Sequence, residues 1–125
     1  MLNEATAPLF RQIATLIEDS IIDGVLLEGQ RAPSTNELAQ FHSINPATAR
    51  KGLLLLVELG ILEKRRGLGM FVTAGATQRI RDRRAGDFAA TYLAPLVDEA
   101  VRIKIDRATL HSLIDQVAAS RGLYQ

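Results

Sequence analysis

The sequence contains no cysteine among its 125 residues, and only 5% of them are aromatic. Without cysteine the chain has no disulfide, no thiolate nucleophile and no cysteine-based metal site, which fits a reducing cytosol. No apolar run approaches the ~20 residues that span a bilayer, and Gly52 to Val57 is far too short. Met1 to Pro8 lacks the basic and apolar regions of a signal peptide. We therefore expect a cytoplasmic protein without a membrane segment.

Sequence motifs of enzymes are also missing. The chain has no G-x-S-x-G motif, no Walker A motif and no G-x-G-x-x-G between a strand and a helix. Gly67-Leu68-Gly69 is too short for a nucleotide-binding loop. His42 and His111 are far apart, and neither belongs to a His/Asp/Glu cluster with metal-ligand spacing. We therefore expect no catalysis, no metal and no cofactor.

Charges of both signs are present but unevenly distributed. The net charge is +1, 23% of the residues are charged and 47% are hydrophobic, which is enough for a folded core. Acidic residues cluster early in the chain, at Glu18, Asp19, Asp23 and Glu28. Cations cluster later, at Arg50, Lys51, Lys64, Arg65 and Arg66. A chain that is nearly neutral overall can therefore still present one positive face.

The first part of the chain predicts a helix over residues 8–23, closed by Gly24. Glu18 falls among the polar residues on one side of this helix. The apolar residues recur at helical spacing on the other side, at Ile13, Leu16, Ile17 and Ile21. In the connector that follows, Val25 to Leu27 either form a short strand or bury against the helix.

A second helix is marked by its N-cap. Ser34 to Glu37 matches a capping box, in which Ser is the N-cap and Glu stands three residues later. The pattern predicts a helix that runs through Phe41, with Leu38, Ala39 and Phe41 as its buried side.

A third helix follows after a tight turn. Asn45 is a strong N-cap and Pro46 suits the first helical position, so we expect a helix from Pro46 to Leu59, closed by Gly60. Gly52 inside this helix costs about 1 kcal/mol relative to Ala, which indicates close packing against the first helix. Two helices joined so closely form a helix-turn-helix.

A β-hairpin is predicted directly after the helix-turn-helix. Ile61 to Lys64 and Met70 to Thr73 are strand-like, and a turn rich in glycine and cations, residues 65–69, separates them. A hairpin in this position is a wing.

The C-terminal part is predicted to be helical. A linker of small residues divides the chain into domains 1–74 and 75–125. Helical composition returns from Thr77, Pro95 is expected to kink or break the long helix, and Asp106 is a good N-cap for a last helix. We interpret a group of arginines near the start as a solvated face, with extra phosphate contact near the wing as the alternative; they are Arg79, Arg81, Arg83 and Arg84.

An ordered set of residues over about 8–73 carries a family resemblance. The set comprises Pro8-Leu9-Phe10, Gln12-Ile13, Gly24, Gly29, Pro33-Ser34, Glu37-Leu38-Ala39, Ile44 to Thr48, Leu56, Gly60-Ile61-Leu62 and Arg66 to Val72. With these residues the chain resembles GntR-family transcriptional repressors, and its short tail is similar to the YtrA subfamily. The resemblance implies a mainly α fold with a small β-hairpin wing: a winged helix-turn-helix followed by a two-helix C-terminal dimerisation unit.

The predicted DNA-binding residues lie at the two helix starts and in the wing. They are Ser34, Thr35, Asn36, Asn45, Pro46, Ala47, Thr48, Arg50, Lys51, Arg65, Arg66, Gly67 and Gly69. Arg50 is the expected base reader, because Arg to guanine is the commonest specific contact, and Lys51 is expected on phosphate. The family usually has Arg where Asn36 stands, so Arg50 and the wing are expected to carry more of the recognition.

The resemblance implies a repressor that binds double-stranded DNA, at a palindromic operator, as a homodimer. The expected dimerisation residues are Phe88, Leu93, Leu96, Val97, Leu110, Leu113, Ile114 and Val117. Two alternatives stay open. One is a small-molecule effector, of unknown identity, at the C-terminal helices or the dimer interface. The other is a winged helix used only for contact with proteins.

Overall fold

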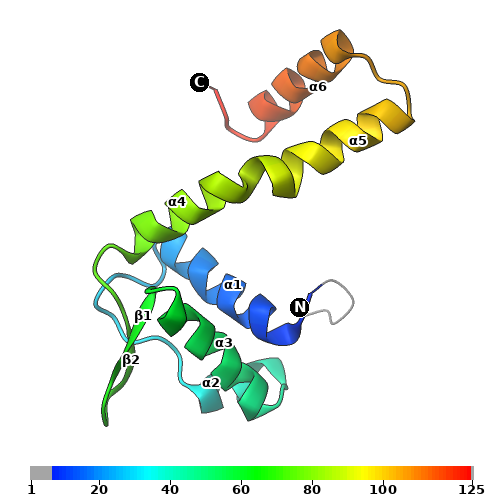
Figure 1. The fold of residues 1–125 in the computed structure, drawn as a ribbon. Coiled ribbons are helices and arrows are strands. Elements are labelled where there is room, and N and C mark those ends of the chain that lie inside the picture. Colours follow the sequence, from blue (N-terminus) through cyan, green and yellow to red (C-terminus); the bar gives the residue numbers. More distant parts are fainter. Residues whose placement is uncertain (1–6, 125) are drawn as a thin grey trace. The chain divides into compact units, whose positions relative to one another are not determined.

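The computed structural model describes residues 7–124, so the outer ends of the two expected domains and most of the segment Met1 to Pro8 lie outside the described residues. The elements follow in the order α1 (Leu9–Ile22), α2 (Thr35–His42), α3 (Pro46–Glu58), β1 (Leu62–Arg65), β2 (Gly69–Val72), α4 (Ala76–Phe88), η1 (Ala89–Leu93), α5 (Ala94–Arg102) and α6 (Arg107–Ser120) (Figure 1). The helices and the hairpin predicted from the sequence are confirmed. They form two compact units, of which one ends at Arg83 and the next begins at Arg84.

The core of the N-terminal unit is built around α3, which packs on both α1 and α2. Its largest fully buried side chains are Ile13, Leu53, Leu56, Ile61, Leu62, Val72 and Ile80. α1 and α3 approach each other at Gly52, where a Cβ atom would lie 2.8 Å from the Phe10 carbonyl oxygen and 2.9 Å from Ile13 Cγ2. The close packing predicted from Gly52 is therefore confirmed.

Two predictions about side chains in the N-terminal unit are wrong. Phe41 was expected on the buried side of α2, but it is 84% exposed, because only Leu38 and Ala39 of this short helix reach the core. Glu18 was expected on the polar side of α1, yet it is only 4% exposed. Both Glu18 carboxylate oxygens accept hydrogen bonds from Arg83, which explains how a charged group can be buried there.

The wing is a two-stranded antiparallel hairpin, and an earlier segment of the chain pairs with the outer edge of β2. β1 pairs with β2 so that Leu62 faces Val72 and Arg65 faces Gly69. On the other side of β2, the Ala32 N–H donates to the Met70 carbonyl at 2.8 Å, and the Gly29 N–H donates to the Val72 carbonyl at 2.8 Å. Val25 to Leu27 form no strand; Leu26 packs against the core, whereas Val25 and Leu27 are 77 and 54% exposed. The segment that pairs with β2 lies a few residues later, at 29–32.

The N-terminal unit extends past the boundary expected at residue 74, because the first turns of α4 belong to its core. Ala76 and Ile80 are fully buried there. Glu28 receives the N–H groups of Gly75 at 2.8 Å and Thr77 at 3.2 Å, and these bonds lower the pKa of its carboxyl group.

Arg79 adds a second tie between α4 and the hairpin. Its Nη1 donates to the Ala74 carbonyl at 2.9 Å, to Thr73 Oγ1 at 3.1 Å and to the Gly60 carbonyl at 3.3 Å. Arg79 and Arg83 are therefore held by specific contacts, although Arg79, like Arg81, stays exposed to solvent.

The C-terminal unit consists of helices with little shared core. The helix does not break at Pro95; instead η1 makes one wider turn, in which the Ala94 N–H donates to the Ala89 carbonyl. Such a turn makes room for the proline ring, which would collide with the preceding turn of a regular helix. Asp106 caps α6 by accepting from the Thr109 N–H at 2.8 Å, as predicted. Within residues 7–124 no helix is long and apolar enough to cross a membrane.

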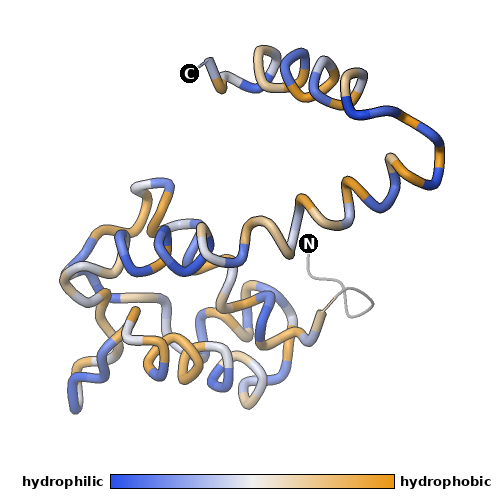
Figure 2. Tube along the Cα trace, turned by 45° about the horizontal axis from the view of Figure 1, so that its top comes forward, coloured by the Kyte–Doolittle hydropathy of each residue, from blue (hydrophilic) through white to orange (hydrophobic). Residues whose placement is uncertain are grey.

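Polar and apolar residues alternate along α5 and α6 (Figure 2). Among the described residues from 84 onwards, only Ala100 is buried, at 5% exposure. The side chains of α6 are all at least partly exposed. This unit therefore leaves most of its apolar surface uncovered within one chain.

The close contact at Gly52 can be tested with a pair of glycine substitutions. Gly52→Ala should stabilise the helix by about 1 kcal/mol through its higher helix propensity. The added methyl group, however, forces α1 and α3 apart, and overpacking of this kind destabilises the fold by about 1–3 kcal/mol. We expect a lower thermal unfolding midpoint. Gly86→Ala in α4 is the control, because its Cβ would meet nothing within 4 Å; it should raise the midpoint. Equal stabilisation by both changes would contradict the packing described.

Candidate nucleic-acid interface

One face of α3 points away from the core and carries the side chains predicted to read DNA. Ala47, Arg50 and Leu54 are exposed at positions i, i+3 and i+7 of the helix, so they form one stripe. Thr48 is half-buried beside them, and Ala49 is buried on the inner side. A small residue followed by an arginine on one exposed helix face is suited to close approach to base edges.

Asn45 acts first as the cap of α3. Its Oδ1 accepts a hydrogen bond from the Ala47 N–H at 2.8 Å, and Pro46 takes the first helical position. The capping bond occupies the amide oxygen of Asn45 and leaves its NH₂ group as the donor for another partner. Asn45 therefore sets the start of α3 and offers a donor beside it.

Lys51 lies on the edge of α3 next to α1. Its Nζ sits 4.2 Å from the centre of the Phe10 ring, a cation–π contact. Because the ring orients the side chain, the ammonium group is placed beside the start of α1 and away from the stripe of Arg50. This position agrees with a phosphate contact better than with base reading.

The start of α2 is fixed by the predicted capping box. Ser34 Oγ accepts from the Glu37 N–H at 3.1 Å, and the Ser34 N–H donates to Glu37 Oε1 at 3.0 Å. The latter bond is the main reason why the pKa of Glu37 lies below its ordinary value. Thr35 and Asn36 then occupy the first turn, whose N–H groups have no acceptor inside the helix.

The wing presents its cations on an ordered hairpin. Arg65 donates to Glu63 Oε1 at 2.9 and 3.1 Å, and its guanidinium lies 4.2 Å from the centre of the Phe71 ring. Arg66 and Gly67 are exposed in the turn. Gly67 has φ +76° there, a conformation that favours glycine.

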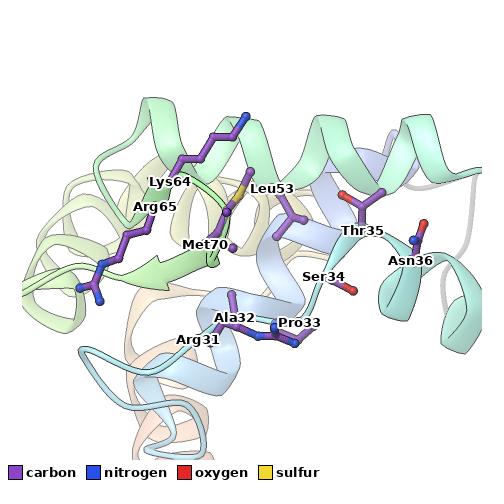
Figure 3. Close-up of a pocket in the computed structure, with 12 residues that line it drawn as sticks. Arg31, Ala32, Pro33, Ser34, Thr35, Asn36, Leu53, Lys64, Arg65 and Met70 are labelled. Carbon is purple, nitrogen blue, oxygen red and sulfur yellow. The ribbon is translucent and has the colours of Figure 1, made fainter.

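A notch of about 300 Å³ separates the start of α2 from the wing (Figure 3). Six of the predicted site residues line it: Ser34, Thr35, Asn36, Arg65, Gly67 and Gly69. The structure therefore brings the α2 motif and the wing motif together. Pro46 to Lys51 do not line this notch, since they form the separate exposed surface of α3.

The notch also contains Arg31 and Lys64, which were not among the predicted site residues. Arg31 precedes the capping box and stands apart from the cation clusters of the sequence, so its place could not be recognised without the pairing of residues 29–32 to β2. Lys64 belonged to a cation cluster, and strand alternation relative to the buried Leu62 is the signal that could have singled it out.

A helix-turn-helix with an exposed face on its second helix, followed by a hairpin that carries cations, defines a winged-helix domain. The family comparison agrees: residues 9–72 match the model described as "Bacterial regulatory proteins, gntR family". The chain belongs to the GntR family of bacterial regulatory proteins.

Among curated relatives, the chain is 25% identical over 115 residues to the HTH-type transcriptional repressor YtrA of Bacillus subtilis, covering 92% of this chain and 88% of that protein. The chain spans only 32% of the length of the regulator YurK of Bacillus subtilis and 44% of the length of the regulator Rv0494 of Mycobacterium tuberculosis. The similarity to YtrA and to Rv0494 thus extends into the C-terminal helices, since it covers 92% and 89% of this chain, whereas the similarity to YurK covers 62% of it.

Solved structures give the same picture. A transcriptional regulator from Oenococcus oeni superposes with a TM-score of 0.73 at 20% identity, covering 94% of this chain and 96% of that one, which shows a shared fold. A crystal structure of AraR(DBD) in complex with operator ORX1 has a TM-score of 0.53 at 35% identity, over 58% of this chain and 87% of that one.

Proposed function

We propose that this protein is a cytoplasmic transcriptional repressor that binds a palindromic operator as a homodimer. The observation that carries the proposal is the exposed stripe of Ala47, Arg50 and Leu54 on α3, in a unit that also brings the start of α2 and the wing together. The resemblance to the repressor YtrA supports repression, and the operator complex of AraR(DBD) supports an operator as the partner.

In this proposal the surface divides its work between bases and phosphates. Arg50 reads a base, most simply a guanine, and the methyl group of Ala47 packs on a thymine. Lys51, the first turn of α2 and the wing hold the phosphate backbone. Asn36 has no charge, so Arg50 and the wing supply most of the electrostatic attraction.

The dimer is proposed from the uncovered apolar faces of α5 and α6. Leu93, Leu96 and Val97 are 41, 39 and 46% exposed, and they share one face with the buried Ala100. The matching face of α6 comprises Leu110, Leu113, Ile114 and Val117 at positions i, i+3, i+4 and i+7. Phe88 extends this apolar surface, since it is 52% exposed and pairs with Tyr92. Exposed apolar faces of this kind mark an interface, and a second copy with the same faces covers them in a two-fold dimer.

Selection of bound duplexes from a random pool tests the proposal most directly. A two-fold dimer should enrich a palindrome whose half-sites lie about one helical turn apart, and the logarithm of the binding constant should fall linearly with the logarithm of salt concentration. If the chain binds no duplex in a salt-dependent way, a winged helix that contacts only proteins would be favoured instead.

Substitutions in α3 separate the base reader from the phosphate contact. Arg50→Ala should weaken operator binding by ~1–3 kcal/mol and relax the base preference at one position per half-site. Lys51→Ala should weaken all sequences alike and reduce the salt slope by about 1 for each subunit bound. Titrations of the selected operator and a scrambled duplex distinguish the two. A sequence-selective effect at Lys51 would reverse the assigned roles, and unchanged binding of Arg50→Ala would remove Arg50 from the site.

A charge on α6 tests the dimer. Leu113→Glu places a carboxylate on the apolar face, so light scattering should report the mass of one chain instead of two. Ser112→Glu is the matched control, because Ser112 is exposed on α6 outside that face, and it should stay dimeric. A folded Leu113→Glu variant that remains a dimer would place the interface elsewhere.

A further inference from the structure

The notch between α2 and the wing contains two cations, Arg31 and Lys64, that were not among the predicted DNA-binding residues and have no individual role in the proposal above. We propose that this notch receives a backbone phosphate of the bound DNA, with Arg31 as its principal contact and Lys64 on the opposite side. The inference rests on the proposed DNA-binding function and adds to it a specific binding site for one backbone phosphate.

Arg31 is placed by the wing and not by the helix-turn-helix. Its backbone forms a bridge with Phe71 on the free edge of β2. The stem of its side chain lies against Gly69, where a Cβ atom would come within 3.3 Å of Arg31 Cδ. Gly69 has φ +113°, so both the backbone conformation and the space favour glycine at this point. The stem is therefore held along the wing.

From there the guanidinium reaches the start of α2. Arg31 Nη2 donates to Glu37 Oε1 at 3.2 Å, the same oxygen that receives the Ser34 N–H. The two side chains of this ion pair are 55 and 60% exposed, so the pair contributes little to stability and the guanidinium keeps donors directed to solvent. Glu37 thus orients Arg31 at the rim of the notch without burying its charge.

The remaining walls of the notch are apolar or carry neutral donors, so the two cations are, among the described residues, its only charged groups apart from Arg65. Between the cations lies an apolar lining that includes Ala32, Pro33, Leu53 and Met70, whose side chains donate no hydrogen bonds. Ser34, Thr35 and the first-turn N–H groups of α2 add neutral donors at one end. Figure 3 shows Lys64 and Arg31 on opposite sides of this lining. Two cations on opposite sides of an apolar notch can hold a strand of the backbone that crosses between them.

The test measures salt dependence in the full-length chain. One released counterion changes the slope of log K against log salt by about 0.9, which corresponds to roughly fivefold in affinity at 0.15 M salt. Arg31→Ala should produce this loss per subunit on the selected operator and on a scrambled duplex alike. Lys64→Ala should reduce the slope in the same direction. Arg31→Lys keeps the charge and should retain most of the slope.

Arg81→Ala is the matched control, because Arg81 is exposed on α4 and does not line the notch; its slope should equal that of the wild type. Thermal unfolding of each variant checks that the wing is intact. If the wild type binds duplex DNA and Arg31→Ala keeps the wild-type slope of log K against log salt, the phosphate site in the notch is refuted while the proposed function stands. A changed base preference in Arg31→Ala would also refute it. If the wild type binds no duplex, the proposed function fails, and this inference fails with it.

Discussion

The position of α3 depends on one close approach, at Gly52, to α1. α3 can lie against α1 only because residue 52 has no side chain, since a Cβ atom there would meet the Phe10 carbonyl and Ile13. The same approach places Lys51, the preceding residue, over the Phe10 ring. A packing constraint inside the core thus decides where a surface cation stands. With the inner face of α3 fixed in this way, helical geometry leaves Ala47, Arg50 and Leu54 on the outside.

A second constraint joins the wing to the base of α4. Arg79 bonds to oxygens of Gly60, Thr73 and Ala74, Glu28 caps the first turn of α4, and Arg83 pairs with the buried Glu18. These polar ties, together with the buried Ile80, make the start of α4 a part of the winged helix. The segment that leads to the C-terminal unit therefore begins on a rigid support.

The sequence predicted those features that depend on neighbouring residues. The caps at Ser34, Asn45 and Asp106 are local hydrogen bonds, and all are present. What could not be predicted depends on residues far apart in the chain. Helical periodicity placed Glu18 among polar residues, because it contains no information about Arg83, 65 positions later. The pairing of residues 29–32 with β2 was missed for the same reason, and with it the position of Arg31.

The two units differ in how they are stabilised, and this difference bears on function. The winged helix has its own core, whereas the described C-terminal residues from 84 onwards bury only Ala100. Short helices without tertiary packing are marginal in water, so α5 and α6 need a partner surface to gain most of their stability. If that partner is a second copy, association orders the helices and also brings two copies of the proposed DNA-binding surface of α3 into one assembly. Operator binding then stabilises the dimer by mass action, and dimer formation raises operator affinity by the same free energy. Recognition of DNA and formation of the C-terminal unit are in this way one coupled equilibrium.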